Sequence, residues 1–118
     1  MTNEEIESIE ISRYNATLAV AKGEALKRLL DNPDYKLVIS EGFFKEYPTE
    51  IALAIAGNTG AYDADALAEQ LKGINVLKGY EFRVAGNHDA GLQDLKAIED
   101  YIAKSVQDEL NDSSEDEE

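Results

Sequence analysis

The acidic end of the chain limits how much of it can fold. Seven of the last eleven residues are Asp or Glu and none is basic, so this segment carries half of the net charge of −14. Like charges at this density repel one another and bury no apolar surface, which predicts a disordered, flexible acidic tail over residues 108–118. The remaining residues, 1–107, match one folded domain in length.

Apolar residues three and four positions apart predict that this domain is mainly α-helical. The first helix is expected from Thr2, which has Glu5 in the position of a capping box, to Asp31. Its apolar stripe comprises Ile11, Tyr14, Leu18, Ala21 and Ala25. The small residues that permit close approach of another helix, within the fold or between chains, are Ala16, Ala19 and Gly23.

Further helices follow from proline positions and apolar spacing. Asn32 and Pro33 end the first helix and begin a second, expected over 33–44, and Pro48 begins a short third one. Because the apolar residues of 49–56 alternate, a strand is the alternative there. Asp63 is the expected N-cap of a fourth helix, and the last helix should end after Leu110. The expected buried positions are Tyr35, Val38, Ile39 and Phe43 in the second helix, Leu67, Leu71 and Ile74 in the fourth, and Leu92, Leu95, Ile98, Ile102 and Val106 in the last.

Residues 74–85 fit two structures. Tyr80, Phe82 and Val84 alternate with charged residues, as in one strand of a hairpin. A lone two-stranded hairpin is marginally stable, so helix is preferred. The predicted fold is a compact bundle of four to five helices with a disordered acidic tail, and the alternative is an α+β fold with a hairpin around residues 74–85.

The charge also restricts the partners. An acidic surface is repelled by nucleic-acid phosphates and by anionic lipid, since binding to either relies on Lys and Arg. The longest apolar run, Ile51 to Ala56, is far shorter than the roughly 20 residues that span a bilayer. We therefore expect a protein partner, no direct contact with nucleic acid and no membrane. The lack of cysteine fits a reducing compartment.

One short motif raises the question of catalysis. Gly86-Asn87-His88-Asp89 resembles the Gly-Asn-His-Asp string of calcineurin-like metallophosphoesterases. His88 is the only histidine in the chain, whereas a two-metal hydrolase needs several imidazoles and carboxylates. The motif is better explained as a helix boundary with Asn87 or Asp89 as N-cap. We expect no catalytic residue, no cofactor, no metal site and no enzymatic activity.

The aromatic residues suggest where a partner binds. Phe43 and Phe44 are adjacent on a predicted helix, so both rings cannot face one core. Either a neighbouring helix covers both, or one of them belongs to an exposed patch that meets a partner. Together with Tyr47, these residues are the candidate partner-binding site.

Residues 24–44 resemble the opening of small acidic helical proteins from tailed bacteriophages. The shared features are a leucine-rich helix (Glu24-Ala25-Leu26-Lys27-Arg28-Leu29-Leu30), the turn Asn32-Pro33-Asp34-Tyr35-Lys36 and the Gly42-Phe43 pair. The resemblance continues through Leu71-Lys72-Gly73-Ile74 and the closing helix. It implies a phage-encoded, helical virion or assembly component, and it assigns no site residues.

Two functions fit these features. The first is a non-enzymatic, virion-associated structural or assembly protein that binds another phage structural protein or itself as a homo-oligomer, in the virion or the host cytoplasm. The alternative is an anti-host inhibitor that mimics DNA and binds a basic site on a host enzyme. The first is preferred, because Lys and Arg are interspersed through residues 1–107.

Overall fold

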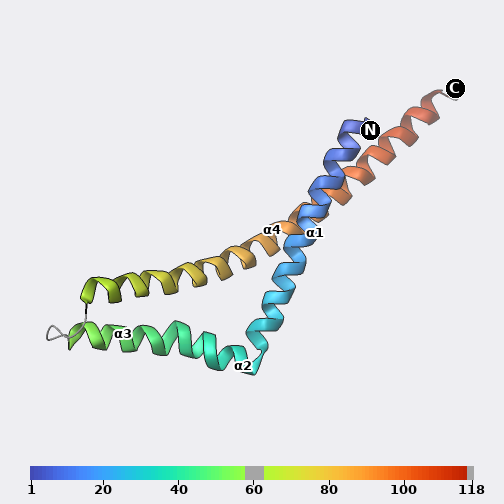
Figure 1. The fold of residues 1–118 in the computed structure, drawn as a ribbon. Helices are drawn as coiled ribbons and strands as arrows, with labels where there is room; N and C mark the ends of the chain where they lie inside the picture. Colours follow the sequence, from blue (N-terminus) through green and yellow to red (C-terminus); the bar gives the residue numbers. More distant parts are fainter. Residues whose placement is uncertain (58–62, 117–118) are drawn as a thin grey trace. The chain divides into compact units, whose positions relative to one another are not determined.

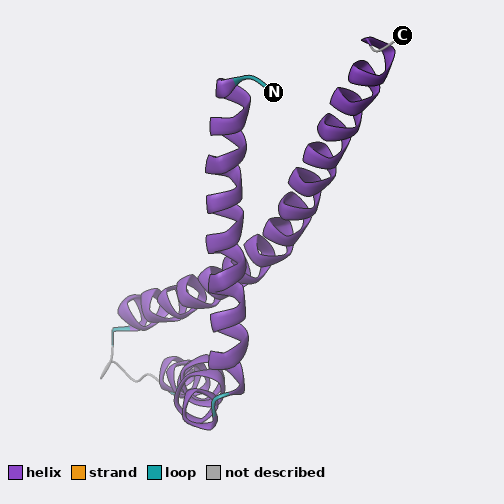
Figure 2. Cartoon of the chain, turned by 90° about the vertical axis from the view of Figure 1, so that its right-hand side faces the viewer, coloured by secondary structure: helices purple, strands orange, loops and turns teal. Residues whose placement is uncertain are grey.

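The fold is built from three helical stretches. The computed structural model describes residues 1–57 and 63–116, with side chains as far as residue 112. Helix α1 spans Asn3–Asp31 and α4 spans Ala64–Asp116. Between them α2 (Pro33–Tyr35), η1 (Lys36–Glu46) and α3 (Tyr47–Ala56) follow without a break (Figure 1). The described ranges contain no strand, which confirms the mainly α class (Figure 2). The strand alternative for 49–56 and the hairpin alternative for 74–85 are therefore wrong.

Capping side chains fix the predicted helix ends. The side-chain oxygen of Thr2 accepts a hydrogen bond from the backbone N–H three residues later, at 3.1 Å. Those of Asn32 and Asp63 accept from the N–H two residues later, at 2.9 and 3.0 Å. Each cap satisfies a backbone donor that has no partner inside the helix. The predicted end of the first helix at Asp31 and the N-cap at Asp63 are confirmed.

The middle stretch is wound more widely than the sequence predicts. Element η1 is a π-helix, and the N–H of Tyr47 donates to the carbonyl of Gly42, five residues earlier. A wider helix turns less per residue, so its covered face recurs every four to five positions rather than every three to four. Tyr35, Ile39 and Phe43 are half-buried as expected, whereas Val38 is exposed.

The predicted compact bundle is wrong. Within the described ranges only three hydrophobic residues are buried, namely Ala16, Ile51 and Ile74. Contacts divide the chain into two compact units, residues 1–23 with 86–118 (unit 1) and residues 24–85 (unit 2). Three helical stretches with so few buried residues do not enclose one common core. The division into a domain over 1–107 and a tail stays a prediction.

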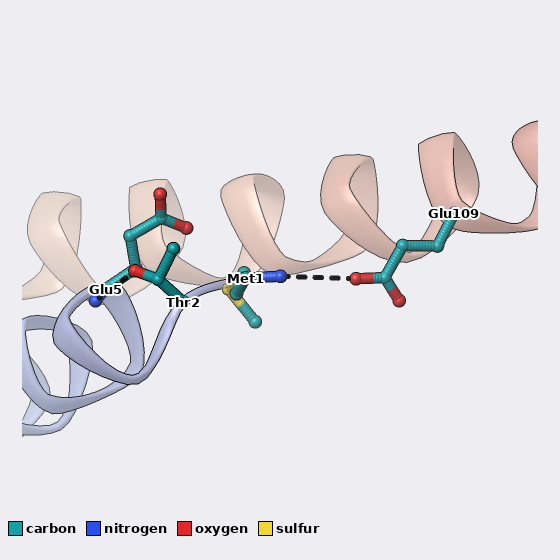
Figure 3. A network of polar contacts seen from close by, with 4 residues as sticks. All are labelled: Met1, Thr2, Glu5 and Glu109. Carbon is teal, nitrogen blue, oxygen red and sulfur yellow. Dashed lines mark hydrogen bonds and ion pairs between the residues drawn. The ribbon is translucent and has the colours of Figure 1, made fainter.

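Unit 1 is an antiparallel pair of helix segments that approach closely at small residues. A Cβ added to Gly23 would lie 2.2 Å from Cβ of His88, and one added to Gly91 would lie 2.9 Å from the carbonyl oxygen of Ala16. At the other end the N-terminal amino group lies 3.4 Å from Oε1 of Glu109 (Figure 3). The small residues of α1 therefore serve close packing within the chain.

The stripe predicted from the large residues of the first helix does not face α4. Ile11, Tyr14 and Leu18 are 57%, 69% and 43% exposed. The two residues of α1 that are buried, Ala16 and Gly23, lie on a different line. Two helices can come this close only where side chains are small.

Unit 2 pairs the middle stretch with the first part of α4. Three contacts show that the two run antiparallel: Tyr35 with Glu81, Phe44 with Lys78, and Tyr47 with Gln70. Among the described residues of this unit, the buried apolar ones are Ile51 of α3 and Ile74 of α4.

The acidic segment is helical for most of its length. Helix α4 continues through Asp116, so its predicted end after Leu110 is wrong, whereas the flexibility expected of residues 108–118 stays a prediction. Residues 117 and 118 of the predicted tail lie outside the described ranges. The segment can be helical despite its charge, because repulsion between like charges one turn apart costs only about 0.2–0.5 kcal/mol per pair and residues such as Glu are good helix formers.

Candidate functional site

The three residues predicted to bind a partner lie together in unit 2. The rings of Phe43 and Phe44 are 5.6 Å apart between centroids and tilted by 59°, and those of Phe43 and Tyr47 are 6.0 Å apart and nearly parallel, at 12°. These distances and angles are typical of favourable aromatic pairs. We call Phe43, Phe44 and Tyr47 the aromatic cluster. The reduced turn of the π-helix allows neighbouring rings to share one side.

Helix α4 holds this cluster in place. The ammonium of Lys78 lies 5.1 Å from the centre of the Phe44 ring, within the range of a cation–π interaction. The hydroxyl of Tyr47 donates to Oε1 of Gln70 at 3.2 Å. Phe43 and Phe44 are half-buried, whereas Tyr47 is 38% exposed. Tyr47 therefore offers the most accessible ring of the cluster, and partner binding there stays a prediction.

A partly buried hydrogen bond is another contact between the middle stretch and α4. The hydroxyl of Tyr35 donates to the carboxylate of Glu81, which joins α2 to α4 within unit 2. Burial first, and then the hydrogen bond and the negative charge of Glu81, raise the pKa of Tyr35 from the usual 10.0 to about 12. All three causes favour the protonated phenol.

This shift predicts a late step in an alkaline titration of the chain. Because the folded pKa of Tyr35 exceeds the unfolded one, its stabilising effect is complete below pH 10.0 and is lost as the pH rises towards about 12. Ultraviolet absorbance of phenolate should show one of the six tyrosines titrating last. In Glu81→Gln the pKa of Tyr35 should fall only part of the way, because burial remains. Six tyrosines that titrate together near 10 would contradict the assignment.

A shallow apolar hollow of about 380 Å³ lies further along α4 in unit 2. It is lined by Leu26, Leu30, Lys78, Glu81, Phe82 and Ala85. Its wall is almost entirely carbon, so it suits an apolar side chain rather than a charged ligand.

The Gly-Asn-His-Asp motif lies inside α4, so its interpretation as a helix boundary is wrong. His88 is 3% exposed and packs against Gly23, and its Nδ1 lies 3.2 Å from Oδ1 of Asp89. In the part of the chain that the structure describes, no three His, Cys, Asp or Glu residues are grouped to hold a metal ion. The imidazole therefore serves the packing of unit 1.

Exposed apolar residues on α4 were not identified from the sequence as a group. Val76, Tyr80 and Phe82 are 73%, 55% and 70% exposed. The signal was the alternation of Tyr80, Phe82 and Val84, which we interpreted only as support for the hairpin alternative. On a helix, such alternation places large apolar side chains on several faces at once, more than one neighbour can cover.

The comparisons with known proteins give no relative. No protein family, curated protein or solved structure matches the chain. Nor does any helix within residues 1–57 and 63–116 have the length and apolar content needed to cross a bilayer.

Proposed function

We propose that this chain is a non-enzymatic structural or assembly protein that acts through contacts with other proteins. The observation that carries the proposal is the exposure of large apolar side chains along α1, η1, α3 and α4. Within the described ranges nineteen large hydrophobic residues are exposed, against three hydrophobic residues that are buried.

This ratio matters more than the exposure of any one residue. Isolated exposed leucines are normal on a monomer, but a chain of this size usually buries much of its apolar surface in a core of its own. Apolar surface that is left in groups marks sites of protein association. The binding energy of this protein would then come from partners that cover these helices.

The charge pattern supports assembly over the imitation of DNA. Several carboxylates are paired with a lysine one turn away: Glu24 with Lys27, Glu41 with Lys45, and Glu69 with Lys72, at 3.8, 3.1 and 3.0 Å. Such pairs neutralise the surface locally, whereas a DNA mimic presents unpaired negative charge to a basic groove.

The context that we propose follows from the resemblance of residues 24–44 to proteins of tailed phages. The protein would belong to the virion or work in the host cytoplasm while the virion is assembled. Its partner would be a phage structural protein or further copies of the chain. The net charge of −14 would keep it soluble and away from DNA.

Mass spectrometry of purified particles, together with affinity capture from the infected host, tests this function. We expect the chain in particles or in a complex with an assembly intermediate, in a fixed ratio to a structural protein. Capture of a host nuclease or polymerase, in a complex that salt dissociates, would instead support the inhibitor function.

A further inference from the structure

The two long sides of the helix pair in unit 1 differ in polarity. A hollow of about 580 Å³ opens on one side, and its polar lining residues are Ser12, Asn15, Asn87 and Asp94. Asn15 lies on α1 and Asn87 lies on α4. Both line the hollow next to the point where Ala16 and Gly91 pack against each other. We call this the polar side.

The other side carries apolar residues. On α1, Val20 lies five positions after Asn15, and on α4, Leu92 lies five positions after Asn87. Five residues turn a helix by about 140°, so Val20 and Leu92 lie across the line of contact from the two asparagines. Residues seven apart return to nearly the same line. The two rows of this apolar side are therefore Ile6, Arg13 and Val20 on α1, and Leu92, Glu99 and Val106 on α4.

The apolar side is accessible in the isolated chain. Ile6, Leu92 and Val106 are 41%, 48% and 49% exposed, and Val20 is half-buried. Arg13 and Glu99 occupy the middle of the two rows. Neither forms an ion pair with any side chain in the described part of the protein.

We propose that a second copy of this chain covers the apolar side, so that two helix pairs form a four-helix arrangement. This inference rests on the proposed function and names one of its partners. Two helix pairs that face each other enclose a core that a single pair cannot enclose. Arg13 of each chain then meets Glu99 of the other.

The two central charges decide between two symmetric arrangements. If α1 lay opposite α1 of the second copy, Arg13 would face Arg13 and Glu99 would face Glu99, and both contacts would repel. If α1 lies opposite α4, a two-fold axis parallel to the helices forms two pairs between Arg13 and Glu99. Facing helices are antiparallel in both arrangements, so charge complementarity decides between them and selects the one in which α1 of each copy faces α4 of the other.

The available area reaches the lower end of the range for specific interfaces. Residues 3–23 form a helix segment ~30 Å long, and two helices of ~10 Å diameter side by side present ~600 Å² over that length. Counted on both partners this is ~1,200 Å², where specific interfaces begin, which fits a reversible dimer.

Sedimentation of the full chain, from micromolar to millimolar concentration, tests the dimer. We expect a reversible equilibrium between monomer and dimer, and Leu92→Asp with Val106→Asp should raise its dissociation constant by roughly 100-fold. The matched control is Ile11→Asp with Tyr14→Asp, which replaces two exposed residues elsewhere on unit 1 and should leave the equilibrium unchanged. Circular dichroism of each variant verifies that the helices form. A wild-type chain that stays monomeric, or equal loss in both double variants, would overturn the proposal.

Charge reversal tests the arrangement. Arg13→Glu alone and Glu99→Arg alone should each weaken self-association about 10-fold, since each places like charges together. An equimolar mixture of the two variants should associate again, because every contact in the mixed dimer joins Glu to Arg. Single variants that dimerise as well as the wild type would contradict the arrangement in which α1 faces α4.

These results and those on the proposed function can differ. A monomeric chain that still enters particles would overturn the dimer and leave the assembly function intact. A dimer that is captured on a host enzyme and never in particles would support the dimer and overturn the assembly function.

Discussion

Gly23→Ala is expected to lower the free energy of unfolding by about 3 kcal/mol, at the upper end of the usual range for overpacking. The added methyl carbon would lie 2.2 to 2.4 Å from three atoms of the His88 side chain, nearer than any real Cβ contact. The nearest of these is Cβ, which is fixed to the backbone of α4, so a change of rotamer cannot relieve the clash. The two helix segments of unit 1 have to separate.

Chemical denaturation followed by circular dichroism measures this loss, and Gly86→Ala is the matched control. Gly86 also lies in a helix of unit 1, but a Cβ there meets nothing within 4 Å. Alanine is the better helix former by roughly 0.5–1 kcal/mol, so this control should gain stability. If both substitutions changed stability in the same direction, the close approach of Gly23 to His88 would be wrong.

Ile74→Ala should cost about 2–4 kcal/mol and mainly destabilise unit 2. Ile74 is 5% exposed, and with Ile51 it is one of two hydrophobic residues buried in the described part of that unit. Its truncation removes apolar contacts and leaves a cavity, and neither effect is compensated when so few residues share the core.

Val76→Ala, two positions along the same helix, provides the comparison. Val76 is 73% exposed, so its truncation should change the free energy of unfolding by less than about 0.5 kcal/mol. Hydrogen exchange resolves the location of each effect along α4. Equal losses at the two positions would show that Ile74 is not part of a core.

The sequence predicts three helix starts correctly, because each of these starts depends on residues next to it. Thr2, Asn32 and Asp63 accept hydrogen bonds from N–H groups two or three residues further on, and Pro33 occupies a first helical position. Such signals need no knowledge of the rest of the fold. The preference for helix at residues 74–85 had a different basis, since it rested on the marginal stability of a lone hairpin.

Local signals of this kind do not predict which side of a helix packs against its neighbour. The large residues Ile11, Tyr14 and Leu18 predicted the buried line of α1, yet the structure buries Ala16 and Gly23. Small side chains contribute little to an apolar pattern, but they decide how closely two backbones approach. The aromatic cluster was found because its members adjoin in sequence, whereas the rows of Arg13 and Glu99 become visible only when α1 and α4 are paired.

The end of α4 has a consequence for how the chain responds to its surroundings. The final carbonyl groups of a helix concentrate partial negative charge, which lysine or arginine usually offsets. The last turn of α4 contains no basic residue. Cations from solution have to fill that role, so the point at which the helix unwinds shifts with ionic strength. The reach of this helix beyond residue 110 is thus set partly by the salt in which the protein is dissolved.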